Sequence, residues 1–288
     1  MSAPEIINIP LSCGLSLEAF HWRGGAKTPV LCLHGLTRNA RDFEDLAPMI
    51  AATGRDVVAL TFRGRGGSPD DPNYLNYHPL TYRDDVAEAL DHLGLADAVF
   101  IGTSLGGITT MLVNATNPAR VKAAIINDVG PELAVEGITR IAGYAGKTKT
   151  QVASLDEAAA EIRAVNGVAF PEKNTDDDFW RVFARRTWRE NADGSWTLAY
   201  DPNVGKALTE VGPAPDLWAP WESLKTKPTL LIRGAISDLL SREIVEKMRA
   251  VHPRFDYAEV PNVGHAPTLT EPEARDAIEK FLRNLDAA

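Results

Sequence analysis

The sequence is short of cysteine, of long apolar runs and of clustered basic residues, and each shortage excludes a class of protein. Its 288 residues include two cysteines, too few for the disulfide framework of a small secreted domain. No apolar run approaches the roughly 20 residues that span a bilayer. The opening M-S-A-P-E lacks the basic and apolar regions of a signal peptide. We therefore expect a cytoplasmic protein with reduced thiols.

Basic residues are outnumbered by acidic ones, and the formal net charge is -9 at pH 7. This charge favours solubility and disfavours binding to nucleic acid or to an anionic membrane. No two of the six histidines have the spacing of metal ligands, so we expect no metal ion and no other cofactor. The expected partner is a small molecule, and the sequence leaves the oligomeric state open.

What the sequence does contain is an alternation of short apolar segments with amphipathic ones. An antiparallel hairpin is expected over residues 6–22. Buried strands are expected at the short apolar segments 29–33, 55–62, 98–101, 121–126, 229–233 and 255–260. Helices are expected at the amphipathic segments 43–51, 81–93, 108–117, 241–251 and 270–285. This alternation predicts an α/β fold with a doubly wound, mostly parallel sheet.

The stretch from about residue 131 to residue 221 has a different pattern. It contains no continuous buried strand, and helical patterns cover 135–144, 154–165 and 175–190. We therefore expect an inserted helical cap over residues 131–221, and a core that consists of residues 1–130 and 222–288.

Residues 98–108 read A-V-F-I-G-T-S-L-G-G-I, the pattern of a buried strand, a sharp turn and the start of a helix. The turn has the form G-x-S-x-G, from Gly102 to Gly106. A serine in such a turn presents its hydroxyl above the sheet, and the glycines let the strand and the helix pass closely. Ser104 is therefore a candidate nucleophile, which needs a base and an acid beside it.

At these residues the chain resembles the α/β-hydrolase superfamily, and the resemblance extends over the whole predicted core. It rests on five segments that follow predicted strands in the family's order: H-G-L-T at 34–37, R-G-R-G-G-S at 63–68, G-T-S-L-G-G at 102–107, R-G-A-I-S-D at 233–238 and V-G-H at 263–265. The resemblance implies that Ser104 is the nucleophile and His265 the general base. It also implies that the backbone N–H groups of Leu36 and Leu105 form the oxyanion hole.

Two aspartates are candidates for the acid that orients the base. Asp238 follows the penultimate strand, which is the commonest position in the family, and Asp128 follows an earlier strand at an alternative position. Only one carboxylate can accept the same imidazole N–H well. On position alone we favour Asp238 and keep Asp128 as the alternative.

Aromatic and basic side chains interleave in the predicted cap. Trp180, Phe183 and Trp188 are candidates for lining an apolar substrate pocket. The arginines between them either face solvent on an amphipathic helix or turn one guanidinium inward to hold a substrate carboxylate. The pattern alone favours the first interpretation without excluding the second.

These features together predict a serine hydrolase that cleaves small to medium carboxylic esters through an acyl-enzyme. Hydrolysis of a carbon–carbon bond, a lactone or an amide would use the same residues and is kept as an alternative. A non-catalytic ligand-binding module is another, because the fold alone does not establish catalysis.

Overall fold

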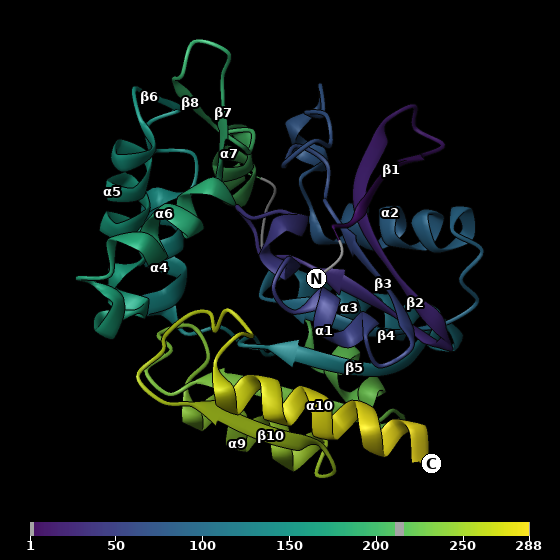
Figure 1. Ribbon diagram of the computed structural model, residues 1–288. Coiled ribbons are helices and arrows are strands. Elements are labelled where there is room, and N and C mark those ends of the chain that lie inside the picture. The colour runs from purple at the N-terminus through teal and green to yellow at the C-terminus, as the bar shows by residue number, and fades with distance from the viewer. Residues whose placement is uncertain (1–2, 211–215, 288) are drawn as a thin grey trace.

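The computed structural model describes residues 3–210 and 216–287, and its centre is a seven-stranded sheet (Figure 1). The strands follow the order β1-β2-β4-β5-β9-β10, and β3 pairs with β2. Their bounds are Glu5–Pro10 (β1), Ser16–Leu33 (β2), Arg55–Leu60 (β3), Ala98–Thr103 (β4), Val121–Asn127 (β5), Thr229–Gly234 (β9) and Asp256–Val260 (β10). β1 pairs antiparallel with β2, whereas the pairs from β2 through β10 are parallel.

Helices cover both faces of this sheet, as expected for a doubly wound fold. One face carries α1 (Ala47–Ala51) and α10 (Pro272–Ala287), whose apolar side chains form one buried cluster with the strands. The other face carries α2 (Pro79–His92), α3 (Leu105–Thr116), α8 (Trp218–Ser223) and α9 (Arg242–Val251), which contribute to a second cluster. Among the described residues, no helix is both long and apolar enough to cross a membrane.

Between β5 and β9 the chain leaves the sheet and forms a smaller unit, drawn in teal and green in Figure 1. Residues 135–210 of this unit are termed the cap segment. They form α4 (Val135–Tyr144), α5 (Leu155–Asn166), α6 (Asp177–Arg185), α7 (Asn203–Glu210) and a small sheet of β6 (Gln151–Val152), β8 (Trp196–Leu198) and β7 (Trp188–Glu190). Residues 211–215 of the predicted cap lie outside the described residues. The predicted boundary at residue 221 falls within α8, and the division into core and cap stays a prediction.

Short 3-10 helices complete the chain. Their bounds are Ala40–Phe43 (η1), Tyr74–Asn76 (η2), Pro118–Arg120 (η3), Gly167–Ala169 (η4), Pro171–Lys173 (η5) and Leu224–Thr226 (η6).

The predicted hairpin strand and the first predicted buried strand form one continuous strand, β2. Residues 23–28 belong to β2, but the register against β3 runs in opposite order on their two sides: residues 19–22 pair with Leu60 through Val57, and residues 30–33 pair with Val57 through Leu60. The chain therefore reverses direction within β2, and β3 passes very close to this segment. Gly24 makes this approach possible, because a Cβ there would lie 2.1 Å from the carbonyl oxygen of Arg55.

Two predicted helices are shorter than expected. The helix over 43–51 begins only at Ala47, because Pro48 is tolerated in a first helical turn but cannot donate to a preceding one. The helix over 175–190 ends at Arg185, and the residues of β7 pair with β8 instead.

The parallel strands place their carboxyl ends at one edge of the sheet, and the cap segment contacts the core at this edge. Asn39, in the loop after β2, donates from Nδ2 to the carbonyl oxygen of Arg186 at 2.7 Å. Gly66, after β3, donates its N–H to the carbonyl oxygen of Ala199 at 2.8 Å. Ligands of parallel α/β folds bind at this edge, so the contacts place the cap segment over the expected site.

Candidate active site

Ser104 lies between β4 and α3 on a backbone that the flanking glycines make possible. Its φ of 53° and ψ of -113° lie outside the regions that L-residues normally adopt. A Cβ on Gly106 would lie 2.0 Å from the carbonyl oxygen of Leu33, and one on Gly102 would lie 2.4 Å from that of Gly106. The turn therefore packs the start of α3 against β2 and presents the serine to a cavity.

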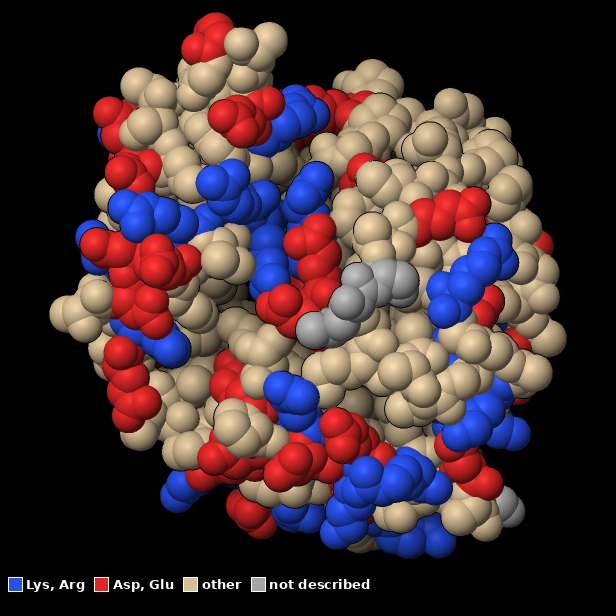
Figure 2. Space-filling model, viewed as in Figure 1, with Lys and Arg blue, Asp and Glu red and all other residues tan. Residues whose placement is uncertain are grey.

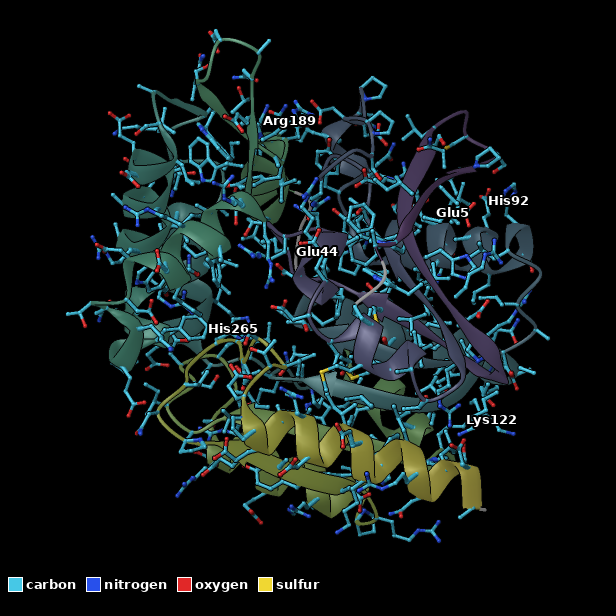
Figure 3. All side chains as sticks on the ribbon, viewed as in Figure 1. Glu5, Glu44, His92, Lys122, Arg189 and His265 are labelled. Carbon is cyan, nitrogen blue, oxygen red and sulfur yellow. The ribbon has the colours of Figure 1, made fainter. Side chains whose placement is uncertain are left out.

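The imidazole of His265 links this serine to a carboxylate. Its Nε2 lies 3.0 Å from Oγ of Ser104, and its Nδ1 lies 2.8 Å from Oδ2 of Asp128. His265 comes from the loop after β10, and Figure 3 shows it where that loop faces the cap segment. With Nδ1 donating to the carboxylate, Nε2 is free to accept the serine proton.

The expectation that Asp238 orients the imidazole is wrong in this structure, and the alternative, Asp128, occupies that place. Asp238 instead pairs with Arg140 of α4 through two hydrogen bonds of 2.5 and 2.9 Å. Burial would raise the pKa of the Asp238 carboxyl, but the hydrogen bonds and charge of Arg140 outweigh burial and lower it. The two aspartates follow β5 and β9, which are neighbours in the sheet, so their order in the sequence could not separate them.

The carboxylate of Asp128 is fully buried and accepts three hydrogen bonds. The backbone N–H of Gly234 donates to Oδ1 at 2.9 Å, and the hydroxyl of Ser237 donates to Oδ2 at 2.7 Å, beside the bond from His265. These donors fix the orientation of the carboxylate. Ser237 was not predicted as a site residue, although it lies in the R-G-A-I-S-D segment that pointed to this loop.

Asn127 is a second residue that the sequence did not indicate. Its Nδ2 donates to the carbonyl oxygen of Pro267 at 2.8 Å and to Oγ1 of Thr103 at 3.0 Å. The amide therefore joins the loop of His265 to the strand that precedes Ser104. An asparagine at a strand end is common, and no local pattern distinguishes this one.

The loop that carries Leu36 is fixed on both sides. The ring of His34 is fully buried, donates from Nδ1 to the carbonyl oxygen of Gly35 at 2.7 Å and accepts at Nε2 from the N–H of Phe62 at 3.0 Å. Burial lowers the pKa of His34 to about 3, so the ring stays neutral near pH 7. On the other side, Nε of Arg65 donates to the carbonyl oxygen of Leu36 at 2.9 Å.

The two residues whose amides are predicted to form the oxyanion hole, Leu36 and Leu105, are both near Ser104. Leu36 lines the same cavity as Ser104, and Leu105 is the first residue of α3. The first N–H groups of a helix have no partner within the helix, so the amide of Leu105 can donate to a ligand. The role of these two groups is a proposal taken up below.

The cavity above Ser104 has a volume of about 200 Å³ and lies between the core and the cap segment. Phe183 and Trp188, two of the three aromatic residues predicted to contact substrate, line it. Trp180 does not belong to its lining: the indole is buried and donates from Nε1 to the carbonyl oxygen of Lys173 at 2.7 Å. The apolar lining also includes Phe179, from the same aromatic cluster of the predicted cap, and side chains that were not predicted, among them Ile141, Ile162, Val165 and Phe170.

A family model described as alpha/beta hydrolase family matches residues 30–276 of the chain. The chain belongs to the alpha/beta hydrolase family. The resemblance inferred from the sequence motifs and the fold class are thereby confirmed.

Curated relatives of this alpha/beta hydrolase are hydrolases with different named substrates. It is 33% identical over 273 residues to a 3-hydroxybutyrate-oligomer hydrolase of Cupriavidus necator, with 90% of each chain covered. It is 28% identical over 261 residues to a 2-(acetamidomethylene)succinate hydrolase of Mesorhizobium japonicum, covering 90% of this chain and 89% of the relative. The crystal structure of an alpha/beta hydrolase from Novosphingobium aromaticivorans superposes with a TM-score of 0.90 at 39% identity, covering 98% and 99% of the two chains. The relatives support hydrolysis as the activity and leave the substrate of this chain open.

The site brings a serine, a histidine and an aspartate into contact, and the part of the chain that the structure describes contains no cluster of metal ligands. Across residues 3–210 and 216–287, no group of three or more His, Cys, Asp and Glu side chains could hold a metal ion. The cavity of this alpha/beta hydrolase is lined by the Ser104 and His265 side chains, by a largely apolar wall and by charged side chains that include Arg38 and Arg186.

Proposed function

We propose that the protein is a serine hydrolase that cleaves small to medium carboxylic esters through an acyl-enzyme. The observation that carries this proposal is the continuous chain of contacts from Ser104 through His265 to Asp128, at 3.0 and 2.8 Å. A serine hydroxyl is barely ionised at neutral pH and needs a base in hydrogen-bond reach. His265 is such a base, and Asp128 fixes its tautomer.

In the first half of the proposed reaction, Oγ of Ser104 attacks the ester carbonyl while Nε2 of His265 takes its proton. The negative charge that develops on the carbonyl oxygen is held by the N–H groups of Leu36 and Leu105, each worth roughly 3–4 kcal/mol in enzymes of this kind. The C–O bond to the alcohol then breaks, and His265 delivers its proton to the leaving oxygen. Asp128 stays ionised and stabilises the imidazolium.

In the second half, a water molecule loses a proton to His265 and attacks the acyl carbon. The ester bond to Ser104 breaks, the proton returns to Oγ, and the carboxylic acid leaves. The two halves use the same base and the same amides, so one site completes the cycle.

The cavity and the relatives support a compact ester. About 200 Å³ is less than the roughly 300–1,000 Å³ of pockets for drug-sized ligands, which favours a short acyl group. The relative named for an oligomer of 3-hydroxybutyrate is consistent with this, because a hydroxy acid joined to itself through its carboxyl and hydroxyl groups is a chain of small esters.

The test is hydrolysis of p-nitrophenyl butyrate by the wild type and by Ser104→Ala, with covalent labelling by a fluorophosphonate probe as a second readout. We expect Ser104→Ala to lose both, whereas Ser12→Ala, at an exposed serine, keeps both. A wild type that the probe does not label would favour the non-catalytic module. Labelling without ester turnover would favour one of the alternative bonds, which a panel with a lactone, an anilide and a vinylogous diketone would identify.

A further inference from the structure

A second hollow, of about 330 Å³, lies beside the proposed active-site cavity and is rich in arginine. Four arginines line it. They come from η1 of the core and from the end of α6 and the start of β7 in the cap segment: Arg41, Arg185, Arg186 and Arg189. The acidic side chains among the lining residues are two, Glu18 and Glu190. The lining therefore carries excess positive charge in a chain whose formal net charge is -9.

The hollow and the cavity share a wall. Arg186 and Trp188 line both of them, so a ligand that passes between these residues would extend from one into the other. Arg186 is firmly placed, because its carbonyl oxygen accepts from Nδ2 of Asn39 at 2.7 Å and its side chain is only 13% exposed. The indole of Trp188 is buried, and its Nε1 has no hydrogen-bond partner in the part of the chain that the structure describes.

Charges of both signs meet at this wall. The guanidinium of Arg186 pairs with Asp45 at 2.6 Å and lies 4.0 Å from Glu44. Figure 2 shows blue and red side chains gathered along the cleft between the cap segment and the core, and Figure 3 shows Arg189 and Glu44 on either side of it. An exposed carboxylate such as Asp45 can yield its place to a ligand carboxylate, since exposed ion pairs are weak.

We propose that the arginine-lined hollow binds a carboxylate of the substrate, so that the preferred substrates are esters with a free carboxylate at some distance from the scissile carbonyl. The inference rests on the proposed function, since the ester must reach Ser104 while its carboxylate lies beside Arg186. Guanidinium groups suit this task because they bind carboxylates through paired N–H donors and stay charged at all physiological pH values. The unpartnered N–H of Trp188 is a further donor at the shared wall.

The experiment compares two p-nitrophenyl esters of similar length, the neutral hexanoate and the monoester of adipic acid, which ends in a carboxylate. The quantity measured is the ratio of kcat/KM for the anionic ester to kcat/KM for the neutral one. We expect the wild type to favour the anionic ester and Arg186→Gln to lower the ratio by about tenfold or more, mainly through KM. Raising the salt concentration lowers the ratio of the wild type and has little effect on that of the variant.

Two control variants separate anion binding from damage to the contact between cap segment and core. Arg181→Gln, on α6, removes an arginine that pairs with Asp156 and Asp178 away from the hollow, and it leaves the ratio unchanged. Asp45→Asn breaks the same ion pair as Arg186→Gln but releases the guanidinium, so the ratio stays the same or rises.

The outcomes distinguish this inference from the proposed function. A ratio near one in the wild type, or equal losses in Arg186→Gln and Asp45→Asn, overturns the carboxylate site while ester hydrolysis stands. If inorganic phosphate alters turnover of the neutral ester through Arg186 while the ratio does not depend on that residue, the hollow binds a free anion, and the substrate inference is overturned. If neither ester is hydrolysed in a Ser104-dependent way, the proposed function fails first.

Discussion

Replacing Asp128 by asparagine perturbs the proposed site at the point where sequence and structure disagreed. The amide has nearly the shape of the carboxylate but only one acceptor oxygen. In the native protein Oδ1 accepts from the N–H of Gly234, and Oδ2 accepts from Ser237 and from Nδ1 of His265. If the amide oxygen takes the Oδ1 position, its NH₂ group faces Nδ1, which must then accept. The proton moves to Nε2, and His265 can no longer deprotonate Ser104.

The opposite orientation of the amide does not rescue the site, because its NH₂ group would then face the N–H of Gly234 in a fully buried position. We therefore expect Asp128→Asn to keep the native fold but to hold His265 in the tautomer that is protonated at Nε2. In the serine protease that serves as the template for this effect, kcat falls by roughly 10⁴, or about 5.5 kcal/mol of transition-state stabilisation. We expect a loss of similar order here.

Asp238→Asn is the matched control, since it removes the same charge from the neighbouring strand end. It weakens the pair with Arg140, and we expect kcat to stay within about threefold of the wild type. The assay is steady-state hydrolysis of p-nitrophenyl butyrate, with thermal unfolding of each variant to confirm that it is folded. A folded Asp128→Asn variant within tenfold of the wild type, or a collapse of activity in Asp238→Asn alone, would refute the reasoning.

Three further predictions concern stability and positioning. Burial lowers the pKa of His34 to about 3, so in acid the unfolded chain binds a proton that the folded chain does not, and stability falls as the pH drops below about 6.5. Between pH 7 and pH 5 we expect the free energy of unfolding, measured in urea, to fall by about 2 kcal/mol. An equally steep fall with pH in His34→Gln would contradict this prediction. Gly106→Ala should lower the free energy of unfolding in urea by about 3 kcal/mol, because its Cβ would lie 2.0 Å from the carbonyl oxygen of Leu33. An unchanged urea midpoint would contradict this prediction. Asn127→Ala should lower kcat and the rate of fluorophosphonate labelling by about tenfold with KM within twofold, because the carbonyl of Pro267 loses its donor; a change in KM alone would argue against a positioning role.

The sequence predicted the α/β class well because buried parallel strands leave a strong local signal. Apolar runs such as residues 121–126 and 229–233 became β5 and β9 within one or two residues. The proximity of Ser104 and His265 was also predictable, because parallel strands end at one edge of the sheet and the loops after them must meet there.

Features that depend on side-chain direction were less predictable. Trp180 and Phe183 are three residues apart on α6, yet one faces the cap interior and the other the cavity. The amphipathic pattern marks both as apolar and cannot say which of two apolar surfaces each one meets. Likewise nothing local distinguishes Asn127 from any asparagine at a strand end, because its partner Pro267 is 140 residues away.

The finding that Asp128, and not Asp238, contacts His265 has a structural consequence for the whole site. Because β5 and β9 are adjacent, a carboxylate after either strand can reach the same imidazole. Placing the acid on β5 leaves Ser237 and the Gly234 amide of the β9 loop to hold it, and leaves Asp238 free to pair with Arg140 of α4. The loop after β9 thus supports the proposed acid and also ties the core to the cap segment, so the position of α4 over the cavity and the orientation of the imidazole depend on the same few residues.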